Sequence, residues 1–189
     1  MGLTVPQHAR VVGVDLVERF SVSGTGRIQL MRCDAARLPF TNASFELIIS
    51  RSVFEHLDRP EEVFREIGRL LVPGGRFVLL TPNRWDYVSL GATLVPNAWH
   101  PWLVGRMTGR AEHDTFPTRY RANTVGKLSS LAKAAGLEVV ELSHLREHPH
   151  YLQFNSLAYG LGVCYEQTAQ RFVRGTRPWI IGTFRRTSG

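Results

Sequence analysis

The sequence predicts an α/β fold, a doubly wound and mostly parallel sheet that finishes with an antiparallel pair of strands at its C-terminal end. Short apolar runs alternate with helical patterns along the chain, which is typical of parallel strands joined by crossover helices. The first two runs are RVVGVD at 10–15 and IQLMRCD at 28–34, and both end in an acid. Ligands of such sheets bind at the carboxyl ends of the strands, so Asp15 and Asp34 are the first candidate site residues.

The middle of the chain predicts a third strand, a helix and a fourth strand. FELIIS at 45–50 follows a turn-rich stretch, and RFVLLTP at 76–82 follows Pro73-Gly74-Gly75, which predicts the end of a helix. We expect Asp58 to cap that helix and Pro60 to occupy its first turn. Its apolar face at helical spacing consists of Val63, Phe64, Ile67, Leu70 and Leu71.

The second half predicts one more helix and the antiparallel pair of strands. The helix covers 123–136, with Asn123 as its cap and Gly136 at its end. The two strands are LEVVELSHL at 137–145 and PWIIGTFRR at 178–186. We interpret residues 1–189 as one domain in which the less regular segments 84–122 and 146–177 are insertions on the substrate side.

Composition narrows the class of protein. The net charge is +7, but only two of the 23 basic residues are Lys, and the Arg residues are scattered rather than clustered. We therefore expect no nucleic-acid partner, although weak contact with an anionic membrane surface stays open. No apolar run approaches the ~20 residues that span a bilayer. With no signal-peptide pattern and two widely spaced cysteines, interpreted as small buried hydrophobes, a cytoplasmic location is predicted.

The two acids suggest a nucleoside site. A carboxylate at a strand end can accept hydrogen bonds from both hydroxyls of a ribose, which suits Asp15. Asp34 ends the next strand and could accept a hydrogen bond from an exocyclic amine such as that of adenine. Each acid by itself could equally be a helix cap or a turn residue. Together, on neighbouring strand ends, they favour a nucleoside.

These residues also carry a family resemblance. RVVGVDL, followed by the combination D-A-x-x-L-P-F, S-F-E-L, E-H-L and L-x-P-G-G-R between residues 34 and 76, resembles the class I S-adenosylmethionine-dependent methyltransferases. The chain is most similar to the small-molecule enzymes of the ubiquinone and menaquinone group, of methyltransferase type 11. The resemblance implies a Rossmann-like sheet, S-adenosyl-L-methionine as cofactor, and methyl transfer to a small-molecule acceptor.

The same resemblance assigns roles to individual residues. Asp15 matches the acid that holds the cofactor ribose, and Leu16 matches the residue that packs on the adenine. The pair beside the adenine amine corresponds to Asp34 and Ala35, and the segment that passes the methionine part corresponds to Ser50 and Arg51.

One family feature has no counterpart. The first strand of the family carries D-x-G-x-G-x-G and lies between the strands equivalent to 10–15 and 45–50, and it is missing from this sequence. Gly24 and Gly26 form a G-x-G only after Asp15, where we interpret it as a turn. We expect a truncated chain or a misplaced start rather than evolutionary loss, and hence weak cofactor binding and an enzyme inactive as written. A non-catalytic or split-chain partner protein is the alternative.

Proton transfer has two candidates, Glu55 and His56, of which His56 is the predicted catalytic base. Some relatives in quinone biosynthesis use E-x-x-E-H to hold a divalent metal, but Ser52 stands at the first position here, so no metal is expected. A structural role for His56 is the alternative.

The acceptor pocket is expected in the insertions, which offer His100, His113, Asp114, Tyr120, Arg121, His148, His150 and Tyr151. An amphipathic or lipid-linked acceptor would suit such a pocket, but the sequence does not identify one.

Two further classes stay open. A nicotinamide-dependent dehydrogenase would also place an acid on a ribose, but it leaves D-A-x-x-L-P-F and the later motifs unexplained. A nucleic-acid methyltransferase is suggested by the charge, but T-P-N at 81–83 is a poor substitute for an Asn-Pro-Pro-Tyr type motif.

Overall fold

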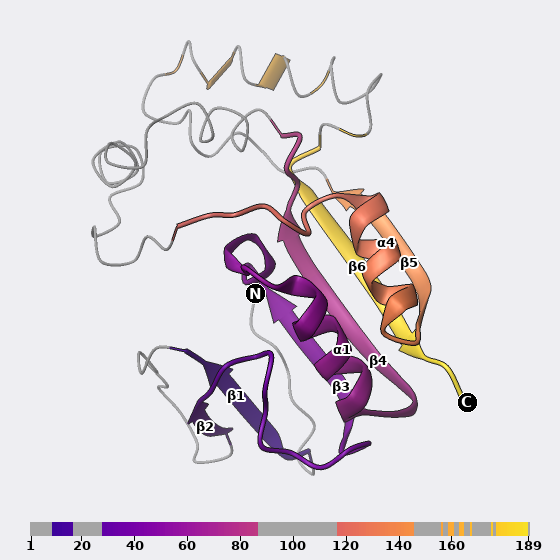
Figure 1. The fold of residues 1–189 in the computed structure, drawn as a ribbon. Coiled ribbons are helices and arrows are strands. Elements are labelled where there is room, and N and C mark those ends of the chain that lie inside the picture. The colour runs from indigo at the N-terminus through magenta and orange to yellow at the C-terminus, as the bar shows by residue number, and fades with distance from the viewer. Residues whose placement is uncertain are drawn as a thin grey trace.

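The computed structural model describes residues 9–16, 28–86, 117–145 and 177–188, together with seven single positions between 156 and 175. The strands lie in two separate sheets (Figure 1). The smaller sheet pairs β1 (Val11–Asp15) with β2 (Ile28–Arg32) in parallel. The larger sheet has the order β3-β4-β6-β5 and consists of β3 (Phe45–Arg51), β4 (Leu71–Pro82), β6 (Trp179–Arg186) and β5 (Leu137–Leu145).

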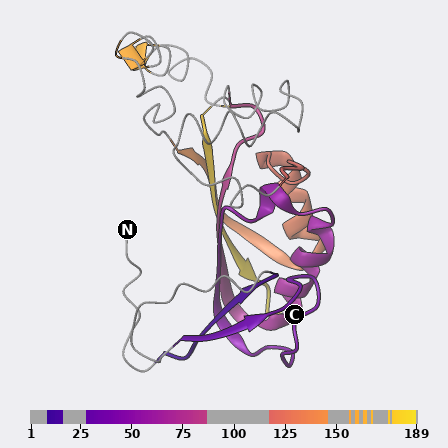
Figure 2. The same ribbon diagram turned by 90° about the vertical axis from the view of Figure 1, so that its left-hand side faces the viewer.

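Strand directions confirm the predicted fold class. β3 and β4 run parallel, whereas β6 is antiparallel to both of its neighbours, β4 and β5. The described helices are η1 (Phe54–His56), α1 (Pro60–Leu70) and α4 (Val125–Ala134). Figure 2 shows all of them on one side of the larger sheet. For α1 this is the side that a right-handed crossover from β3 to β4 selects.

Both predicted helix caps are wrong by one residue. α1 takes Arg59 as its N-cap, without a side-chain bond, while the carboxylate of Asp58 lies 3.2 Å from Nε of Arg119. α4 is capped by Thr124, whose hydroxyl accepts from the backbone N–H of Lys127. The side chain of Asn123 is drawn away because it is buried and donates to Thr81 and to the Pro82 carbonyl. In both cases a residue from a distant segment binds the side chain that was expected to cap the helix.

The end of α1 also differs from the prediction. Leu71 was expected on the apolar face of the helix, but it adopts extended backbone angles and begins β4. β4 therefore includes Pro73-Gly74-Gly75, which the sequence placed between helix and strand. Leu71 is fully buried in the core from its position in the strand.

The core lies between the helices and the larger sheet, and four phenylalanine rings form its centre. Phe64 of α1 lies edge-on to Phe54, Phe77 and Phe184, at centroid distances of 5.3, 5.7 and 5.8 Å. Phe77 of β4 and Phe184 of β6 stack at 5.6 Å. These rings join α1 to the two central strands of the larger sheet, β4 and β6.

Replacing Gly68 with alanine is expected to destabilise the fold, because a Cβ there would stand 2.4 Å from the Ala135 carbonyl oxygen at the end of α4. Overpacking of this kind typically costs about 1–3 kcal/mol. Urea unfolding followed by circular dichroism measures the change. Gly126→Ala is the matched control, because a Cβ at this α4 position meets nothing within 4 Å. Equal midpoints for the two variants would contradict the close approach of α1 and α4.

Several expectations fall on other parts of the chain. Most of 84–122 and 146–177 lies outside the described residues, so their assignment as insertions in a single domain stays a prediction, as do the roles of His100, His113, Asp114, His148, His150 and Tyr151. The cysteines are less buried than expected: Cys33 is half-buried and Cys164 is exposed. In the described part of the chain, no helix is long and apolar enough to cross a bilayer.

Candidate cofactor site

The carboxyl ends of β1 and β2 bring the two predicted acids onto neighbouring strand ends. In the parallel register Asp15 is paired with Arg32, and Asp34 follows two residues later. The Cys33 N–H donates to the Asp15 carbonyl at 2.9 Å, which ties the end of β1 to the residue before Asp34. Both acids are exposed. The parallel alignment that a shared ligand requires is therefore present.

Asp34 has the turn role that its sequence allowed, and its cofactor role stays a prediction. One carboxylate oxygen accepts from the Ala36 N–H at 2.9 Å and so closes a turn. This bond fixes the orientation of the carboxylate, which has a second oxygen to offer. Ala35 packs against the main core, whereas Leu16, beyond Asp15, is 59% exposed. An exposed aliphatic side chain beside the two acids would suit the planar base of a nucleoside.

Ser50 and Arg51 end β3, which belongs to the other sheet. The Ser50 hydroxyl is buried and has no hydrogen-bond partner among the described residues, and Arg51 is exposed. A buried hydroxyl without a partner is costly and marks a place where a polar ligand group could bind. The predicted cofactor residues fit the cofactor chemically, but they are divided between two sheets that are not hydrogen-bonded to each other.

Behind the end of β3 lies a buried polar network that the sequence did not reveal. Glu55 is only 5% exposed, and the Thr81 hydroxyl donates to its carboxylate at 3.4 Å. The Asn123 amide donates in turn to Thr81 at 2.7 Å. The network joins η1, β4 and the segment before α4. Glu55 was a sequence candidate for proton transfer, whereas neither Thr81 nor Asn123 belongs to a motif that would have indicated this contact.

His56 lies at the rim of this network, with 31% of its side chain exposed. Its Nδ1 lies 3.2 Å from the Pro117 carbonyl oxygen, which can only accept, so Nδ1 carries the hydrogen. In the neutral ring Nε2 then holds the lone pair, 3.8 Å from the Glu55 carboxylate. This tautomer leaves Nε2 as the proton-accepting atom, which is compatible with the predicted base.

The segment around Tyr120 is held across these residues. The N–H groups of Arg119 and Tyr120 both donate to the Glu55 carbonyl, at 2.6 and 3.1 Å. Arg121 donates to the Asp58 carbonyl and lies 3.7 Å from its carboxylate. Tyr120 has a φ of 49°, a strained value for a residue other than glycine. Tyr120 and Arg121, expected in the acceptor pocket, are thus fixed beside His56.

Other polar groups have structural partners. The Asn83 amide, in the T-P-N stretch, donates to the carbonyls of Gly175 and Arg177 at 2.6 and 2.8 Å, so it is committed to the backbone.

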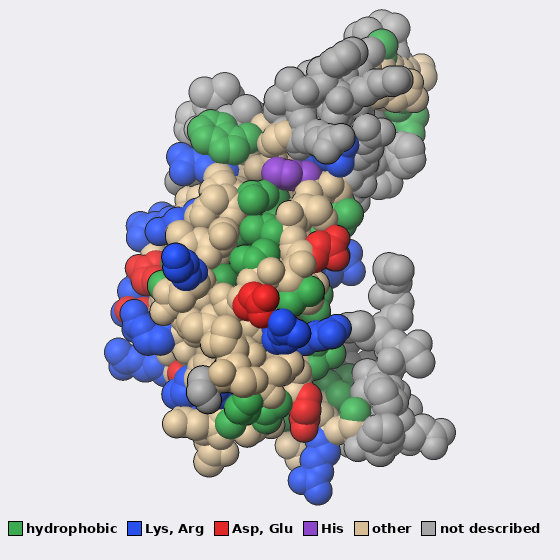
Figure 3. Space-filling model, turned by 90° about the vertical axis from the view of Figure 1, so that its right-hand side faces the viewer, with side chains coloured by type: hydrophobic (Ala, Val, Ile, Leu, Met, Phe, Trp, Pro, Cys, Tyr) green, Lys and Arg blue, Asp and Glu red, His purple; other side chains and the backbone are tan. Residues whose placement is uncertain are grey.

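No set of three potential metal-ligating side chains occurs in the described ranges. Figure 3 shows Lys and Arg side chains interspersed with Asp and Glu on the face it presents, rather than gathered in one patch.

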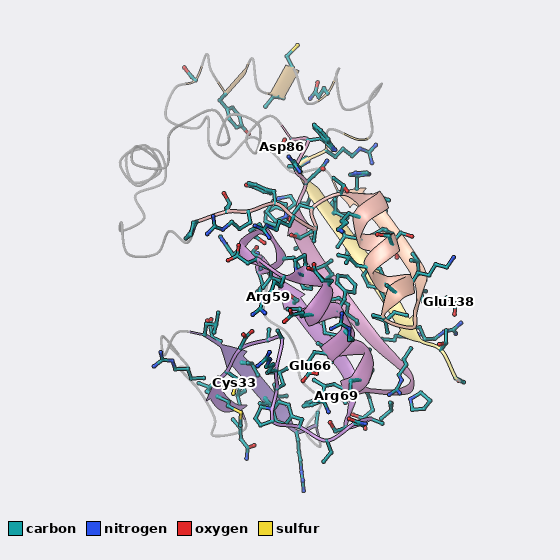
Figure 4. All side chains as sticks on the ribbon, in the orientation of Figure 1. Cys33, Arg59, Glu66, Arg69, Asp86 and Glu138 are labelled. Atoms are coloured by element: carbon teal, nitrogen blue, oxygen red, sulfur yellow. The ribbon has the colours of Figure 1, made fainter. Side chains whose placement is uncertain are left out.

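Glu66 and Arg69 on α1, labelled in Figure 4, stabilise the loop after β2. The Arg69 guanidinium binds the Glu66 carboxylate at 2.7 Å and donates to the Leu38 and Phe40 carbonyls, and Glu66 accepts from the Leu38 N–H. The hollow beside them is lined by α1 and by Ala36 and Arg37 of the loop after β2. These contacts hold the D-A-x-x-L-P-F segment in place. The part of the motif from Leu38 to Phe40 therefore has a structural role.

Glu55 and Glu66 should affect the dependence of stability on pH in opposite directions. Burial raises the pKa of Glu55 above 4.5, so its contribution falls as the pH rises from 4.5 through the raised value. The hydrogen bond from Arg69 lowers the pKa of Glu66, so its contribution is present above 4.5 and is lost as the pH falls. Glu55→Gln should therefore gain stability relative to wild type as the pH rises, whereas Glu66→Gln should lose it. Urea unfolding at a series of pH values measures the difference in unfolding free energy between each variant and the wild type. If this difference changed with pH in the same direction for both variants, the prediction would be contradicted.

Comparisons with known proteins find methyltransferases. Residues 2–79 match the model of the methyltransferase domain family. The chain is 26% identical over 120 residues to the ubiquinone/menaquinone biosynthesis C-methyltransferase of Ralstonia nicotianae, covering 60% of this chain and 48% of that protein. It is 27% identical over 168 residues to the ubiquinone biosynthesis O-methyltransferase of Nitrosococcus oceani, covering 80% and 67%. The chain thus spans about half the length of the first of these relatives.

Solved structures share the fold. A chain of the complex between the Haloferax volcanii Trm112 methyltransferase activator and a methyltransferase matches with a TM-score of 0.63 and 17% identity, covering 95% of this chain and 72% of that one. An S-adenosylmethionine-dependent methyltransferase from Mesorhizobium loti matches with a TM-score of 0.53 and 18% identity, covering 94% and 81%. Residues 2–79 thus match the methyltransferase domain family, and the chain shares its fold with these two solved chains.

Proposed function

We propose that the protein to which these residues belong transfers a methyl group from S-adenosyl-L-methionine to a small-molecule acceptor. The observation that carries the proposal is the pair of acids on parallel strand ends, Asp15 and Asp34, tied together by the bond from the Cys33 N–H to the Asp15 carbonyl. Asp15 would accept from the ribose hydroxyls, and Asp34 from the adenine amine. A cytoplasmic location, predicted from the sequence, belongs to this proposal.

The remaining site residues would act on the methionine part and on the acceptor. The Ser50 hydroxyl would gain a hydrogen-bond partner from the amino acid end of the cofactor, since it has none among the described residues. The cofactor supplies a sulfonium methyl group. His56, with its Nε2 lone pair, would take a proton from a hydroxyl or an acidic carbon of the acceptor. Relatives that modify ubiquinone precursors make a ring-containing, lipid-linked acceptor the first class to examine.

Residues 1–189 alone should bind the cofactor only weakly. The sequence has no D-x-G-x-G-x-G, whose glycines would let the backbone approach the ligand. In addition, Asp15 and Ser50 belong to separate sheets, so the two ends of the ligand are not held on one frame. Calorimetric titration with S-adenosylmethionine should therefore give no micromolar binding, and a micromolar dissociation constant would refute this part of the proposal.

The ligand class can be tested despite weak affinity. Saturation-transfer NMR detects weak ligands, so we expect a signal from S-adenosylhomocysteine that excess S-adenosylmethionine removes. NAD is the matched control, because a dehydrogenase would also bind its ribose through an acid. A signal from NAD that S-adenosylhomocysteine fails to displace would favour the dehydrogenase and contradict the methyltransferase.

A second candidate function is that of a non-catalytic or split-chain partner protein. It is favoured by the separation of β1 and β2 from the larger sheet. The two candidates differ in their products, since only the enzyme gives labelled acceptor when the protein is incubated with methyl-labelled S-adenosylmethionine and a ubiquinone precursor.

A further inference from the structure

A hollow of about 300 Å³ lies between α1 and the turn that follows β2. Its volume is at the lower end of the range for sites that hold small ligands. Every lining side chain except that of Ala36 is charged. The charged residues are Arg37 of the turn and Glu62, Arg65, Glu66 and Arg69 of α1. The hollow therefore suits a small charged ligand rather than an apolar one.

Both carboxylates in the lining are already bound by an arginine. The Arg69 guanidinium lies 2.7 Å from the Glu66 carboxylate, and the Arg59 guanidinium lies 3.1 Å from the Glu62 carboxylate. Figure 4 labels Arg59, Glu66 and Arg69 along α1. Because these pairs compensate the two negative charges, any further basic group at the hollow gives it a net positive charge.

Arg37 and Arg65 are the further basic groups. Both are exposed, and among the described residues neither guanidinium has a hydrogen bond or an ion pair. They belong to the two walls of the hollow, since Arg37 lies in the turn and Arg65 on α1. A guanidinium binds a pair of phosphate or carboxylate oxygens through two parallel N–H groups. An anion in the hollow could therefore be bound from two sides.

The wall that carries Arg37 is held in place by hydrogen bonds of its own. The Arg37 N–H donates to the Asp34 carbonyl, and the Ala36 N–H donates to the Asp34 carboxylate, each at 2.9 Å. The Leu38 N–H donates to the Glu66 carboxylate at 2.8 Å and so ties the turn to α1. Since the backbone of this wall is already ordered, little conformational entropy is lost when a ligand binds.

We propose that this hollow binds a small anion that carries a phosphate group, which Arg37 and Arg65 hold from its two walls. A phosphate group offers three strong acceptor oxygens and so can serve both guanidiniums, whereas a single carboxylate has two oxygens. The same chemistry occurs in a free phosphate ester and in a lipid headgroup. A free ester fits better, because the lining has no apolar side chain larger than Ala36 to insert into a membrane. This inference rests on the charges around the hollow and not on the proposed function.

The test titrates ¹⁵N-labelled protein with inorganic pyrophosphate at constant ionic strength and follows the backbone amide shifts. We expect saturable shifts at Ala36, Arg37 and Arg65. The amides of Asp15 and Leu16 should stay unmoved, because these residues do not line the hollow. Added sodium chloride should weaken the binding, since salt screens interactions between exposed charges.

Two variants remove one guanidinium each. Arg37→Gln and Arg65→Gln should each lower the affinity for pyrophosphate about threefold to tenfold. Arg76→Gln is the matched control, because Arg76 is also exposed but lies on β4, where its neighbour Phe77 is buried on the helix side. Side chains alternate along a strand, so Arg76 points to the other face of the sheet. Its replacement removes the same charge and should leave the affinity unchanged.

Glu62→Gln provides a test in the opposite direction. The substitution removes a negative charge from the lining and releases the Arg59 guanidinium that is paired with it. The affinity for pyrophosphate should therefore rise about twofold to fivefold. A variant that only damaged the fold could not produce this gain.

Each result decides the proposal. Saturable shifts at the hollow that Arg37→Gln and Arg65→Gln both weaken support it. Absence of saturable shifts overturns it, and so does an equal loss in Arg76→Gln, which would indicate a general effect of charge. Vesicles of phosphatidylglycerol form the second arm: if they shift these amides and pyrophosphate does not, the ligand is a lipid surface and the proposal fails. No cofactor is used, so a protein that binds pyrophosphate here but not S-adenosylhomocysteine would defeat the proposed function and leave this inference standing.

Discussion

Replacing Phe64 with alanine is expected to lower the free energy of unfolding by about 3–5 kcal/mol. Phe64 is fully buried on α1, and its ring contacts Phe54, Phe77 and Phe184. The substitution leaves a cavity between the helix and two central strands, and the remaining rings can close it only in part. Urea unfolding monitored by circular dichroism measures the loss.

Phe40→Ala is the matched control for this change. Phe40 is half-buried in the loop after β2, and its one ring contact among the described residues is with Phe45 at 5.0 Å. Its loss should cost clearly less than the loss of Phe64. If the two variants unfolded at the same urea concentration, the four-ring cluster would not be the centre of the core.

The second large effect is expected at Asp15. Replacing it with asparagine keeps the shape but removes the charge and one of the two accepting oxygens. A hydrogen bond to a charged group contributes about 1.5–3 kcal/mol, so the affinity for S-adenosylhomocysteine should fall roughly tenfold to hundredfold. Because binding to residues 1–189 is expected to be weak, the affinity is best measured by NMR titration.

Asp58→Asn serves as the control for Asp15→Asn. Asp58 is also an exposed aspartate, but it lies before α1 and interacts with Arg119 and Arg121. Its replacement should leave cofactor affinity unchanged. Equal losses from both variants would indicate a general effect of charge and would remove the specific role assigned to Asp15.

Much of the fold could be predicted from the sequence because it depends on local pattern. The strand at 137–145 was predicted with the bounds that β5 has, and β3 differs from its prediction by one residue. The caps of α1 and α4 could not be predicted, because Asp58 and Asn123 each have a stronger partner in a distant segment. The end of α1 was missed for a similar reason, since Leu71 joins a strand whose partners are remote in sequence.

The candidate site was likewise predicted only in part from the sequence. Asp15 and Asp34 were recognisable because Asp15 ends its strand and Asp34 follows the end of the next one, a property of the local sequence. The contact of Glu55 with Thr81 and Asn123 was not, because it joins three elements that only the tertiary fold brings together. Nor could the sequence show that Ser50 and Arg51 would lie on a different sheet from the two acids.

The central claim is that the carboxyl ends of β1 and β2 bind the nucleoside part of the cofactor. The most direct measurement is a map of backbone amide shifts when ¹⁵N-labelled protein is titrated with S-adenosylhomocysteine. The account predicts saturable shifts at Asp15, Leu16, Asp34 and Ala35, which Asp15→Asn weakens. Shifts confined to other places, such as the hollow between Arg37 and Arg65 along α1, with these four amides unmoved, would contradict it.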